Sequence, residues 1–330
     1  MSMSRPERAG AALSVSVVIP ARNAAATLER ALRSVFAQDT PPAEIVVVDD
    51  GSSDATAAVA RAFDGRVRLV RTRDHDAALP AGRGAGAARA RNLGMALATG
   101  DCIALLDADD EWLANKLAVQ LDRLAARPDV VLVGSNFHWS RDGAITGTDF
   151  DAVPPGPEGT EAWRALLAYS YLHTSTLLFR RAALDRCGGF DPALRTAEDQ
   201  DFWIRLGLSG GIGLVETPLA IVHAGRGSLG AADPSGSVRD TMTVVRRHLR
   251  AQRGRLSAAE RRWILKCRHR QAARRLSDAA GLSARLGAIG HGLRALRYGA
   301  EPADVLSTLV LAVPGVRTLK RRTRDARRRA

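Results

Sequence analysis

Carboxylate side chains that can bind a metal ion or accept a proton stand in three short stretches of this sequence. The stretches are Asp49-Asp50, Asp107-Ala108-Asp109-Asp110 and Glu198-Asp199-Gln200-Asp201. Carboxylates two residues apart on an extended backbone point to the same side, about 7 Å apart. Asp107 and Asp109 have this spacing, which suits a shared Mg²⁺ or Mn²⁺ ion, because these ions take carboxylate oxygens and keep water or substrate phosphates in their other positions. The alternative is that these acids only cap a helix over 111–124.

The third acidic stretch suits a different chemistry. Asp199, with Glu198 beside it, can act as the general base that takes a proton from a substrate hydroxyl. Because the helix dipole also stabilises acids at a helix N-terminus, the same residues can simply begin a helix. His223, after the apolar run 220–222, can ligate the metal ion or touch a phosphate, or it can be an ordinary surface or core histidine.

The apolar pattern predicts the strands and helices that position these side chains. Short runs of apolar and β-branched residues predict strands, and apolar residues at a period near 3.6 predict helices. The predicted strands are 14–19, 45–48, 67–70 and 102–106, and the helices that alternate with them are 27–36, 55–63, 87–98 and 111–124. This alternation predicts an α/β fold with a mostly parallel sheet and helices on both faces. Ligands of such sheets bind beyond the carboxyl ends of the strands, so the predicted rim contains Pro20, Arg22, Asn23, Asp49, Asp50, Arg91 and Asp107.

The pattern changes after Pro128, where the sheet is predicted to become mixed. The predicted elements are strands at 130–133, 175–179 and 220–222, a hairpin around Asp142-Gly143, and helices at 161–169, 257–276 and from Pro302. Ser257 and Glu260 form a capping box at the head of one of these helices. We therefore predict a disordered N-terminus at 1–12, a sheet domain at 13–235 and a basic helical region at 236–330.

The net charge of +13 is distributed unevenly along the chain. Residues 240–330 hold 23 Lys/Arg and 6 Asp/Glu, which leaves 25 and 29 for residues 1–239. A nearly neutral catalytic or binding domain is thus followed by a cationic segment, which suits phosphate on lipid head groups or on nucleic acid. Three cysteines without a CxxC pair exclude a disulfide scaffold and a cysteine zinc site and favour a reducing compartment. The apolar run 305–316 is shorter than the ~20 residues that cross a bilayer, so no membrane span is predicted.

Five motifs in a fixed order make the sequence resemble the family 2 glycosyltransferases of GT-A fold. They are VSVVIPARN at 15–23, VVVDDGSSD at 46–54, ARNLG at 90–94, LDADD at 106–110 and EDQD at 198–201. The resemblance covers about residues 13–230 and leaves the helical region as a C-terminal extension. Neither GxGxxG nor GxxxxGK[ST] occurs, so a dinucleotide dehydrogenase and a P-loop NTPase are not indicated. The QxxRW signature of the processive members is also absent, which favours the addition of a single sugar.

The resemblance implies an inverting glycosyltransferase of the hexosyltransferase type. A nucleoside-diphosphate sugar, with a UDP-sugar favoured, is expected to lie along the rim residues named above. The resemblance implies Mn²⁺ or Mg²⁺ at Asp109 and Asp107, with His223 as a further candidate, and Asp199 as the base with Glu198 beside it. Such an ion neutralises the charge that develops on the departing diphosphate. The expected acceptor is a hydroxyl of a glycan or a lipid-linked molecule in surface polysaccharide or glycoconjugate synthesis.

Other functions fit parts of the sequence. A sugar-nucleotide binding protein without turnover would use the same rim, but the presence of Asp107, Asp109 and Asp199 argues against it. A nucleic-acid-binding protein would use the basic region, but Trp263 and Tyr298 are the only aromatic residues after residue 239, so no nucleic acid is expected. Residues 303–330 are instead expected to meet an anionic membrane surface, which would make this a cytoplasmic protein at the inner face of the membrane. A solvated appendage or an oligomer contact is the alternative for that segment.

Overall fold

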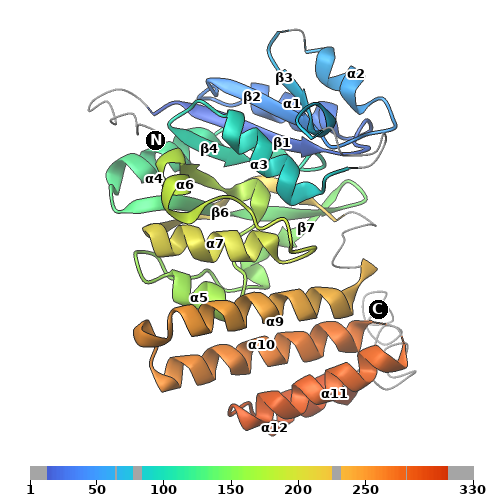
Figure 1. The fold of residues 1–330 in the computed structure, drawn as a ribbon, viewed down its shortest axis with the longest axis vertical. Helices are drawn as coiled ribbons and strands as arrows, with labels where there is room; N and C mark the ends of the chain where they lie inside the picture. The colour runs from blue at the N-terminus through green and yellow to red at the C-terminus, as the bar shows by residue number, and fades with distance from the viewer. Residues whose placement is uncertain (1–12, 64, 77–83, 225–231, 280, 311–330) are drawn as a thin grey trace, which may run out of the picture. The chain divides into compact units, whose positions relative to one another are not determined.

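The chain has two compact units. The computed structural model describes residues 13–63, 65–76, 84–224, 232–279 and 281–310, with the backbone alone at 307–310. Of these, the first unit holds the residues up to 166 together with 170–193 and 198–224, and the second holds 167–169, 194–197 and the residues from 232 onward. The first unit contains the sheet, and the second contains long helices (Figure 1). The predicted disordered segment 1–12 lies outside the described residues.

Nine strands form one sheet among the described residues of the first unit. They are β1 (Val15–Ala21), β2 (Glu44–Asp49), β3 (Arg68–Arg71), β4 (Cys102–Leu105), β5 (Glu111–Trp112), β6 (Val130–Arg141), β7 (Ala144–Thr148), β8 (Leu178–Arg180) and β9 (Gly211–His223). Their order is β3-β2-β1-β4-β8-β6-β9-β5, with β7 paired to β6. β1 to β4 are parallel, whereas β8 runs antiparallel to both β4 and β6, and β9 runs parallel to β6. The predicted change from a parallel to a mixed sheet is confirmed.

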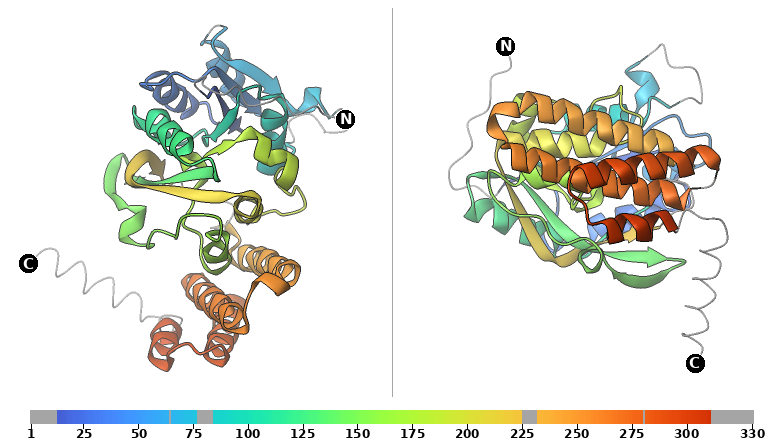
Figure 2. Two further views of the ribbon diagram at one scale, coloured as in Figure 1. Left: turned by 90° about the vertical axis from the view of Figure 1, so that its left-hand side faces the viewer. Right: turned by 90° about the horizontal axis from the view of Figure 1, so that it is seen from below.

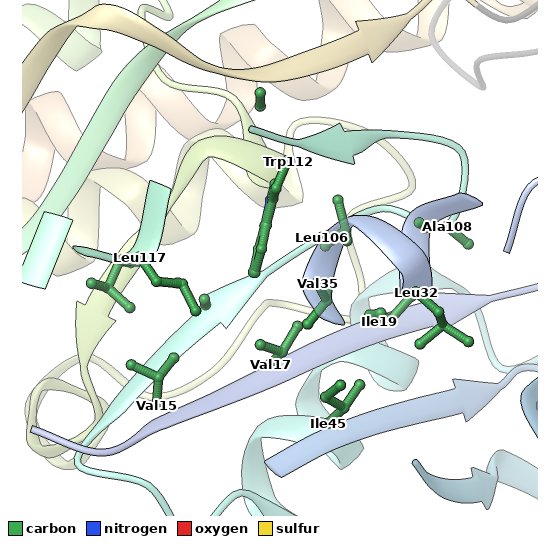
Figure 3. Packing of buried hydrophobic residues seen from close by; sticks show 14 of the residues in the cluster. Val15, Val17, Ile19, Leu32, Val35, Ile45, Leu106, Ala108, Trp112 and Leu117 are labelled. Carbon is green, nitrogen blue, oxygen red and sulfur yellow. The ribbon is translucent and has the colours of Figure 1, made fainter. Parts of the chain in front are cut away.

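Helices cover both faces of the parallel part of the sheet. Those of the first unit are α1 (Leu28–Phe36), α2 (Thr56–Arg61), α3 (Ala87–Leu97), α4 (Lys116–Ala126), α5 (Trp163–Ala168), α6 (Leu184–Cys187) and α7 (Glu198–Ser209). Because side chains alternate along a strand, the odd-numbered residues Val15, Val17 and Ile19 of β1 share one face, and Val17 and Ile19 lie beside Val35 and Leu32 of α1 (Figure 3). On the other face, Val46 and Val48 of β2 pack against Ala90 of α3. The predicted layered α/β fold is confirmed.

The helix predicted over 111–124 is wrong in its first turn. Glu111 and Trp112 form the short strand β5, which pairs antiparallel with β9, and α4 begins only at Lys116. The indole Nε1–H of the buried Trp112 donates to the carbonyl oxygen of Ser175 at 2.7 Å. Trp112 belongs to the same buried cluster as β1 and α1, so tertiary packing outweighs the local helical pattern. The acids of 107–110 therefore lie between two strands and do not cap a helix.

The second unit is built from α9 (Pro234–Ala251), α10 (Ala258–Asp278), α11 (Leu282–Arg297) and α12 (Pro302–Val310). α10 packs against the other three helices, as two further views also show (Figure 2). The core of the second unit contains Val238 and Met242 of α9, Ala272 and Leu276 of α10, and Ala288 of α11. The predicted capping box of Ser257 and Glu260 is present at the start of α10. None of the described helices is both long enough and apolar enough to cross a membrane.

Candidate active site

The loops that follow β1 and β2 hold each other in place. The backbone N–H of Asn23 donates to Ser52 Oγ (3.0 Å), and Asn23 Oδ1 accepts from the backbone N–H of Ser53 (2.9 Å). Asp49 Oδ1 accepts from the backbone N–H of Ser52 at 2.9 Å. Asn23 has a φ of 49°, which asparagine adopts more readily than most residues. The neighbouring Arg22 side chain is exposed and so can reach a ligand at the ends of these strands.

Asp50, which was predicted to contact the nucleotide sugar, accepts hydrogen bonds from groups of the chain itself. Its buried carboxylate accepts hydrogen bonds from Thr72 Oγ1 (3.0 Å) and from the backbone N–H groups of Ala85 (2.7 Å) and Gly86 (2.9 Å). A Cβ on Gly84 would lie 2.5 Å from Asp50 Oδ2, so only glycine fits against it. Because both carboxylate oxygens serve the chain's own groups, Asp50 anchors the turn before α3 and positions its neighbours.

Arg91 of α3 joins two acidic stretches that are far apart in the sequence. Its Nη2 donates to Asp107 Oδ1 at 2.7 Å, and its Nη1 donates to Glu198 Oε1 at 3.2 Å. The Arg91 side chain is only 8% exposed, and its Nε has no hydrogen-bond partner among the described residues. Arg91, which was predicted to lie near the nucleotide, binds two carboxylates with its terminal nitrogens. Asp107, two residues after the end of β4, and Glu198, the first residue of α7, are thus held by one guanidinium.

The charges around Arg91 shift the pKa values of both of its partners. Burial alone would raise the pKa of Asp107, but Arg91 and then His173 outweigh it and hold this pKa below its ordinary value. Burial and the charge of Asp199 raise the pKa of Glu198 to about 7, although Arg91 opposes them. Asp107 is therefore a fixed anion at neutral pH, while Glu198 can exchange a proton there.

Asp109 carries the carboxylate at this site that other residues satisfy least. Its side chain is exposed, and it has no ion-pair partner within the described part of the chain. Desolvation of its carboxyl group, followed by the charge of Asp107, raises the pKa of Asp109. The main chain of Asp109 is held separately, because Arg30 Nη2 donates to its carbonyl oxygen at 2.8 Å.

The next acid, Asp110, is buried and binds the turn before β8 and the end of β9. It accepts hydrogen bonds from Ser175 Oγ and from the backbone N–H of His223 (3.0 Å). Burial raises the pKa of Asp110 to about 7, and the nearby His173 acts in the opposite direction. Asp110 therefore holds the acidic loop against the start of β8 and the end of β9.

His223 stands at the end of β9, as predicted, next to the acidic loop. Its Nε2 lies 2.7 Å from Glu111 Oε1, and Arg30 Nε lies 3.1 Å from the same carboxylate oxygen. The His223 ring is thus already paired with the Glu111 carboxylate. The charge of His223 also opposes the rise in the pKa of Asp109. A metal contact for His223 would require this pair to rearrange.

His173 and Ser175 belong to the site and were missed from the sequence. Ser175 Oγ accepts from the backbone N–H of Asp107 (3.1 Å). The charge of His173 favours the ionised form of both Asp107 and Asp110, although burial outweighs it at Asp110. In a parallel sheet the residues that follow each strand line the ligand site. β8 is antiparallel to β4, so the residues that precede β8 lie beside the end of β4. An antiparallel pairing predicted for 175–179 would have been the signal.

Aromatic side chains border the acidic loop at His173. The ring centroid of Phe137 lies 5.0 Å from those of Trp139 and His173. The Nε1–H of Trp139 donates to Asp149 Oδ1 at 3.2 Å, and burial raises the pKa of Asp149. An aromatic surface beside a carboxylate can contact a ligand that has both apolar and hydrogen-bonding groups.

The acidic loop fits a divalent cation that is shared with a bound diphosphate. No group of three or more histidine, cysteine or acidic side chains among the described residues is arranged to hold a metal ion alone. Mg²⁺ and its analogues are commonly held by only one or two carboxylates, with substrate phosphates and water as the other ligands. Asp109 meets this need, because a cation would satisfy its carboxylate and lower its raised pKa. Asp107 is the less accessible second candidate, since Arg91 occupies one of its oxygens.

A mixed α/β sheet with acidic residues at its strand ends is the architecture predicted for a GT-A fold. The chain belongs to glycosyl transferase family 2, whose family profile matches residues 16–188. It is 32% identical over 210 residues to the succinoglycan biosynthesis protein ExoU of Rhizobium meliloti (strain 1021), covering 60% of this chain and 58% of ExoU. It is 30% identical over 218 residues to WfaP of Escherichia coli, described as a UDP-Glc:α-D-GlcNAc-diphosphoundecaprenol β-1,3-glucosyltransferase, covering 64% of this chain and 78% of WfaP. The chain spans little more than half the length of ExoU.

Solved structures share the fold at low sequence identity. The structure of Staphylococcus aureus TarS 1–349 in complex with UDP-GlcNAc has a TM-score of 0.61 and 19% identity, covering 95% of this chain and 92% of TarS 1–349. The mannosyltransferase PcManGT of Pyrobaculum calidifontis, in complex with GDP-Man and Mn²⁺, has a TM-score of 0.54 and 22% identity, covering 92% of this chain and 86% of PcManGT. These likenesses confirm the predicted GT-A fold.

Proposed function

We propose that this protein is an inverting glycosyltransferase that moves one sugar from a nucleoside-diphosphate sugar to an acceptor hydroxyl in surface polysaccharide or glycoconjugate synthesis. The observation that carries the proposal is the bridge by Arg91 between Asp107, after β4, and Glu198, beside Asp199 on α7. The reaction needs an acidic group that holds a cation for the donor diphosphate close to a carboxylate for the acceptor hydroxyl, and the bridge supports such a site.

Each residue has a chemical task in this proposal. Asp199 accepts the proton of the acceptor hydroxyl, whose oxygen bonds to the anomeric carbon as the bond to the diphosphate oxygen breaks. Glu198, with a pKa of about 7, lies beside it and modulates its charge. Asp109, with Asp107, would hold Mn²⁺ or Mg²⁺, which when bound stabilises negative charge on the leaving diphosphate. His223, paired with Glu111, is a weaker candidate for that ion.

The donor is proposed to lie along the ends of β1, β2 and β4. Pro20, Arg22, Asn23 and Asp49 border the base and the ribose, and Asp50 supports them through the turn that it anchors. We favour a UDP-sugar because TarS is described with UDP-GlcNAc and WfaP as using UDP-Glc. A lipid-linked or glycan acceptor follows from the acceptor named for WfaP.

The test separates binding of the donor from its turnover. Thermal unfolding midpoints with UDP-, GDP- and dTDP-sugars and Mn²⁺ identify the donor, because a ligand that binds only the folded state raises the midpoint. Acceptor-free hydrolysis of that donor then reports the chemistry. We expect EDTA and Asp109→Asn to remove both the Mn²⁺-dependent midpoint shift and hydrolysis. We expect Asp199→Asn to keep the shift and to lower hydrolysis about 100-fold or more.

The matched control is Asp122→Asn, since Asp122 is an exposed acid on α4 outside the site. It should behave like the wild type in both assays. Donor binding with no hydrolysis by the wild type, and no effect of Asp199→Asn, would contradict the proposal and point to a binding protein without turnover.

We also propose that the protein works at the inner face of the membrane, because a lipid-linked acceptor would reside there. The segment predicted to meet the membrane, 303–330, lies mostly outside the described residues. Its role in membrane binding stays a prediction that deletion of 311–330 and vesicle co-sedimentation would test.

A further inference from the structure

Helix α11 exposes a continuous row of large apolar side chains. Leu282 is 72% exposed, Leu286 60%, Ile289 43% and Leu293 58%. Their spacing of four, three and four residues places them along one face of a helix that turns about 100° per residue. Isolated exposed leucines are ordinary, whereas a contiguous apolar row in a folded protein marks a surface that meets a partner or a lipid phase.

The face of α11 that is buried within its own unit carries small residues instead of large apolar ones. The buried residues there are Ala284, Ala288, Gly292 and Ala295. Small side chains let α11 approach α10 closely, and a Cβ on Gly287 would already lie 3.0 Å from Leu276 Cδ1. The helix therefore uses its smallest residues for internal packing and leaves its largest apolar residues outside. A helix stabilised only by its own unit would have the reverse distribution.

Positive charge borders the apolar row on both sides. With 100° per residue, Arg285 falls on one side of the row and Arg297 on the other. The helix Leu282–Arg297 contains three arginines and no acid. An apolar stripe between cationic side chains is the composition of helices that lie in the plane of an anionic membrane surface. Arginines at such a border reach the lipid phosphates while the apolar residues enter the acyl region.

We infer that α11 is a membrane-docking helix, which lies flat on an anionic bilayer with Leu282, Leu286, Ile289 and Leu293 inserted below the head groups. At 16 residues it is about 24 Å long, too short to span the hydrocarbon core. The inference deepens the location part of the proposed function and gives it an element other than 303–330.

Two other occupants of the row are opposed by charge. In a symmetric pair of copies two α11 helices would meet, and neither carries an acid that could pair with the arginines of the other. Residues 311–330 of the same chain carry eight Lys/Arg and one Asp, so covering the row with them would also bring like charges together. A bilayer with anionic lipids supplies both the apolar phase and the negative charge.

The test compares the full chain with Leu286→Gln/Ile289→Gln/Leu293→Gln. Co-sedimentation uses phosphatidylcholine vesicles with about 30 mol% phosphatidylglycerol, at low salt and at ~0.5 M salt, where attraction between exposed charges is screened. We expect the triple variant to bind at least about tenfold more weakly than the wild type, most clearly at high salt, because apolar insertion is not screened. The matched control is Ile145→Gln/Trp263→Gln, which removes exposed apolar side chains elsewhere and should bind within about twofold of the wild type.

A second variant, Arg285→Gln/Arg297→Gln, tests the charged border. It should lose binding to anionic vesicles by about fivefold per charge at low salt and should resemble the wild type on phosphatidylcholine alone. Vesicle binding needs no turnover, and donor binding is measured on the same variants. A failure of membrane docking would therefore not contradict the proposed glycosyltransferase function. A failure of donor binding or turnover would likewise not contradict membrane docking.

Three results would overturn the inference. The first is equal vesicle binding by the triple variant and the wild type. The second is a wild-type dimer that becomes a monomer in the triple variant, seen by sedimentation velocity with no vesicle binding, which would make the row a contact between copies. The third is loss of thermal stability in the triple variant without lipid, because it would show that the chain itself covers the row.

Discussion

Arg91 is the residue on which the geometry of the site depends most. Its guanidinium is nearly buried and neutralises Asp107 and Glu198 together. A planar guanidinium offers several N–H groups in fixed directions, so it can hold two carboxylates in one orientation, which an ammonium group does less well. Without it, two partly buried carboxylates would repel each other.

We predict that Arg91→Met lowers both stability and turnover. The free energy of unfolding should fall by ~3 kcal/mol, the usual scale for leaving a buried charge without its partner. Hydrolysis of the donor should also fall, because Glu198 and Asp107 lose their common anchor. Chemical denaturation and the hydrolysis assay measure the two effects. Arg89→Met is the control, since Arg89 is exposed on the same helix and should change neither quantity appreciably. Full activity in Arg91→Met would disprove the role of the bridge.

The elements show which parts of the fold could be predicted from local sequence. β1, β2 and β4 are buried runs with helices between them, so their period and length identify them without knowledge of their neighbours. β5 could not be predicted, because two residues have no period and pair only with β9, a hundred residues later. His173 was missed for a related reason: its place depends on the antiparallel direction of β8.

The sequence predicts which residues of the site can do chemistry, because only some residue types can bind a cation or accept a proton, but it does not predict their contacts. Residue type marked Asp107 and Glu198 as candidates, and Arg91 brings their carboxylates together, but acids at strand ends and at the start of a helix also cap or begin helices, so their type alone could not establish the contact. The internal task of Asp50 was not predictable, since it depends on the backbone N–H groups of Ala85 and Gly86, whose positions are set by the turn.

At the level of elements, the contact of α3 with the sheet yields a second prediction. A Cβ on Gly94 would collide with Val18 Cγ1 and come within 3.1 Å of Val48 Cγ2. Gly94→Ala should therefore destabilise the protein by ~2 kcal/mol, the cost of overpacking a well-packed core. Gly254→Ala is the control, because nothing lies within 4 Å of its added Cβ. Equal unfolding midpoints in urea for the two variants would refute the close packing of α3.

At the scale of the molecule, most of the positive charge lies in the second half of the chain. The helical unit there contains two adjacent histidines, the buried His269 and the half-buried His291. His269 Nδ1 lies 2.9 Å from His291 Nδ1, and Tyr298 stacks on the His269 ring. Burial, followed by the charges of His291, Arg294 and Arg246, lowers the pKa of His269 to about 4. Burial and the same arginines also lower the pKa of His291. Both rings are therefore neutral in the folded protein at neutral pH.

This predicts how stability changes with pH. An unfolded histidine has a pKa near 6.5, so between about pH 6.5 and pH 4 the unfolded chain binds more protons than the folded one. The contribution of these two histidines to the free energy of unfolding should fall as the pH falls through this window, whereas Glu198 and Asp110, with pKa values raised to about 7, contribute in the opposite direction. Relative to the wild type, His269→Gln should therefore lose less of its thermal midpoint between pH 7.5 and pH 5, measured by circular dichroism. His75→Gln, at an exposed position, should leave this loss unchanged. A larger loss in His269→Gln than in the wild type would reverse the assignment.

The pairing of β5 with β9 also governs when the site can exist during synthesis. Glu111 pairs with Ile221, and the backbone N–H of His223 completes the binding of Asp110. A ribosome that has added only the first two hundred residues has made every acid of the site, but not the strand that closes the loop between Asp107 and Trp112. The growing polypeptide therefore cannot assemble its acidic loop until both ends of that pairing have left the exit tunnel, and a fragment that stops before residue 221 lacks it altogether.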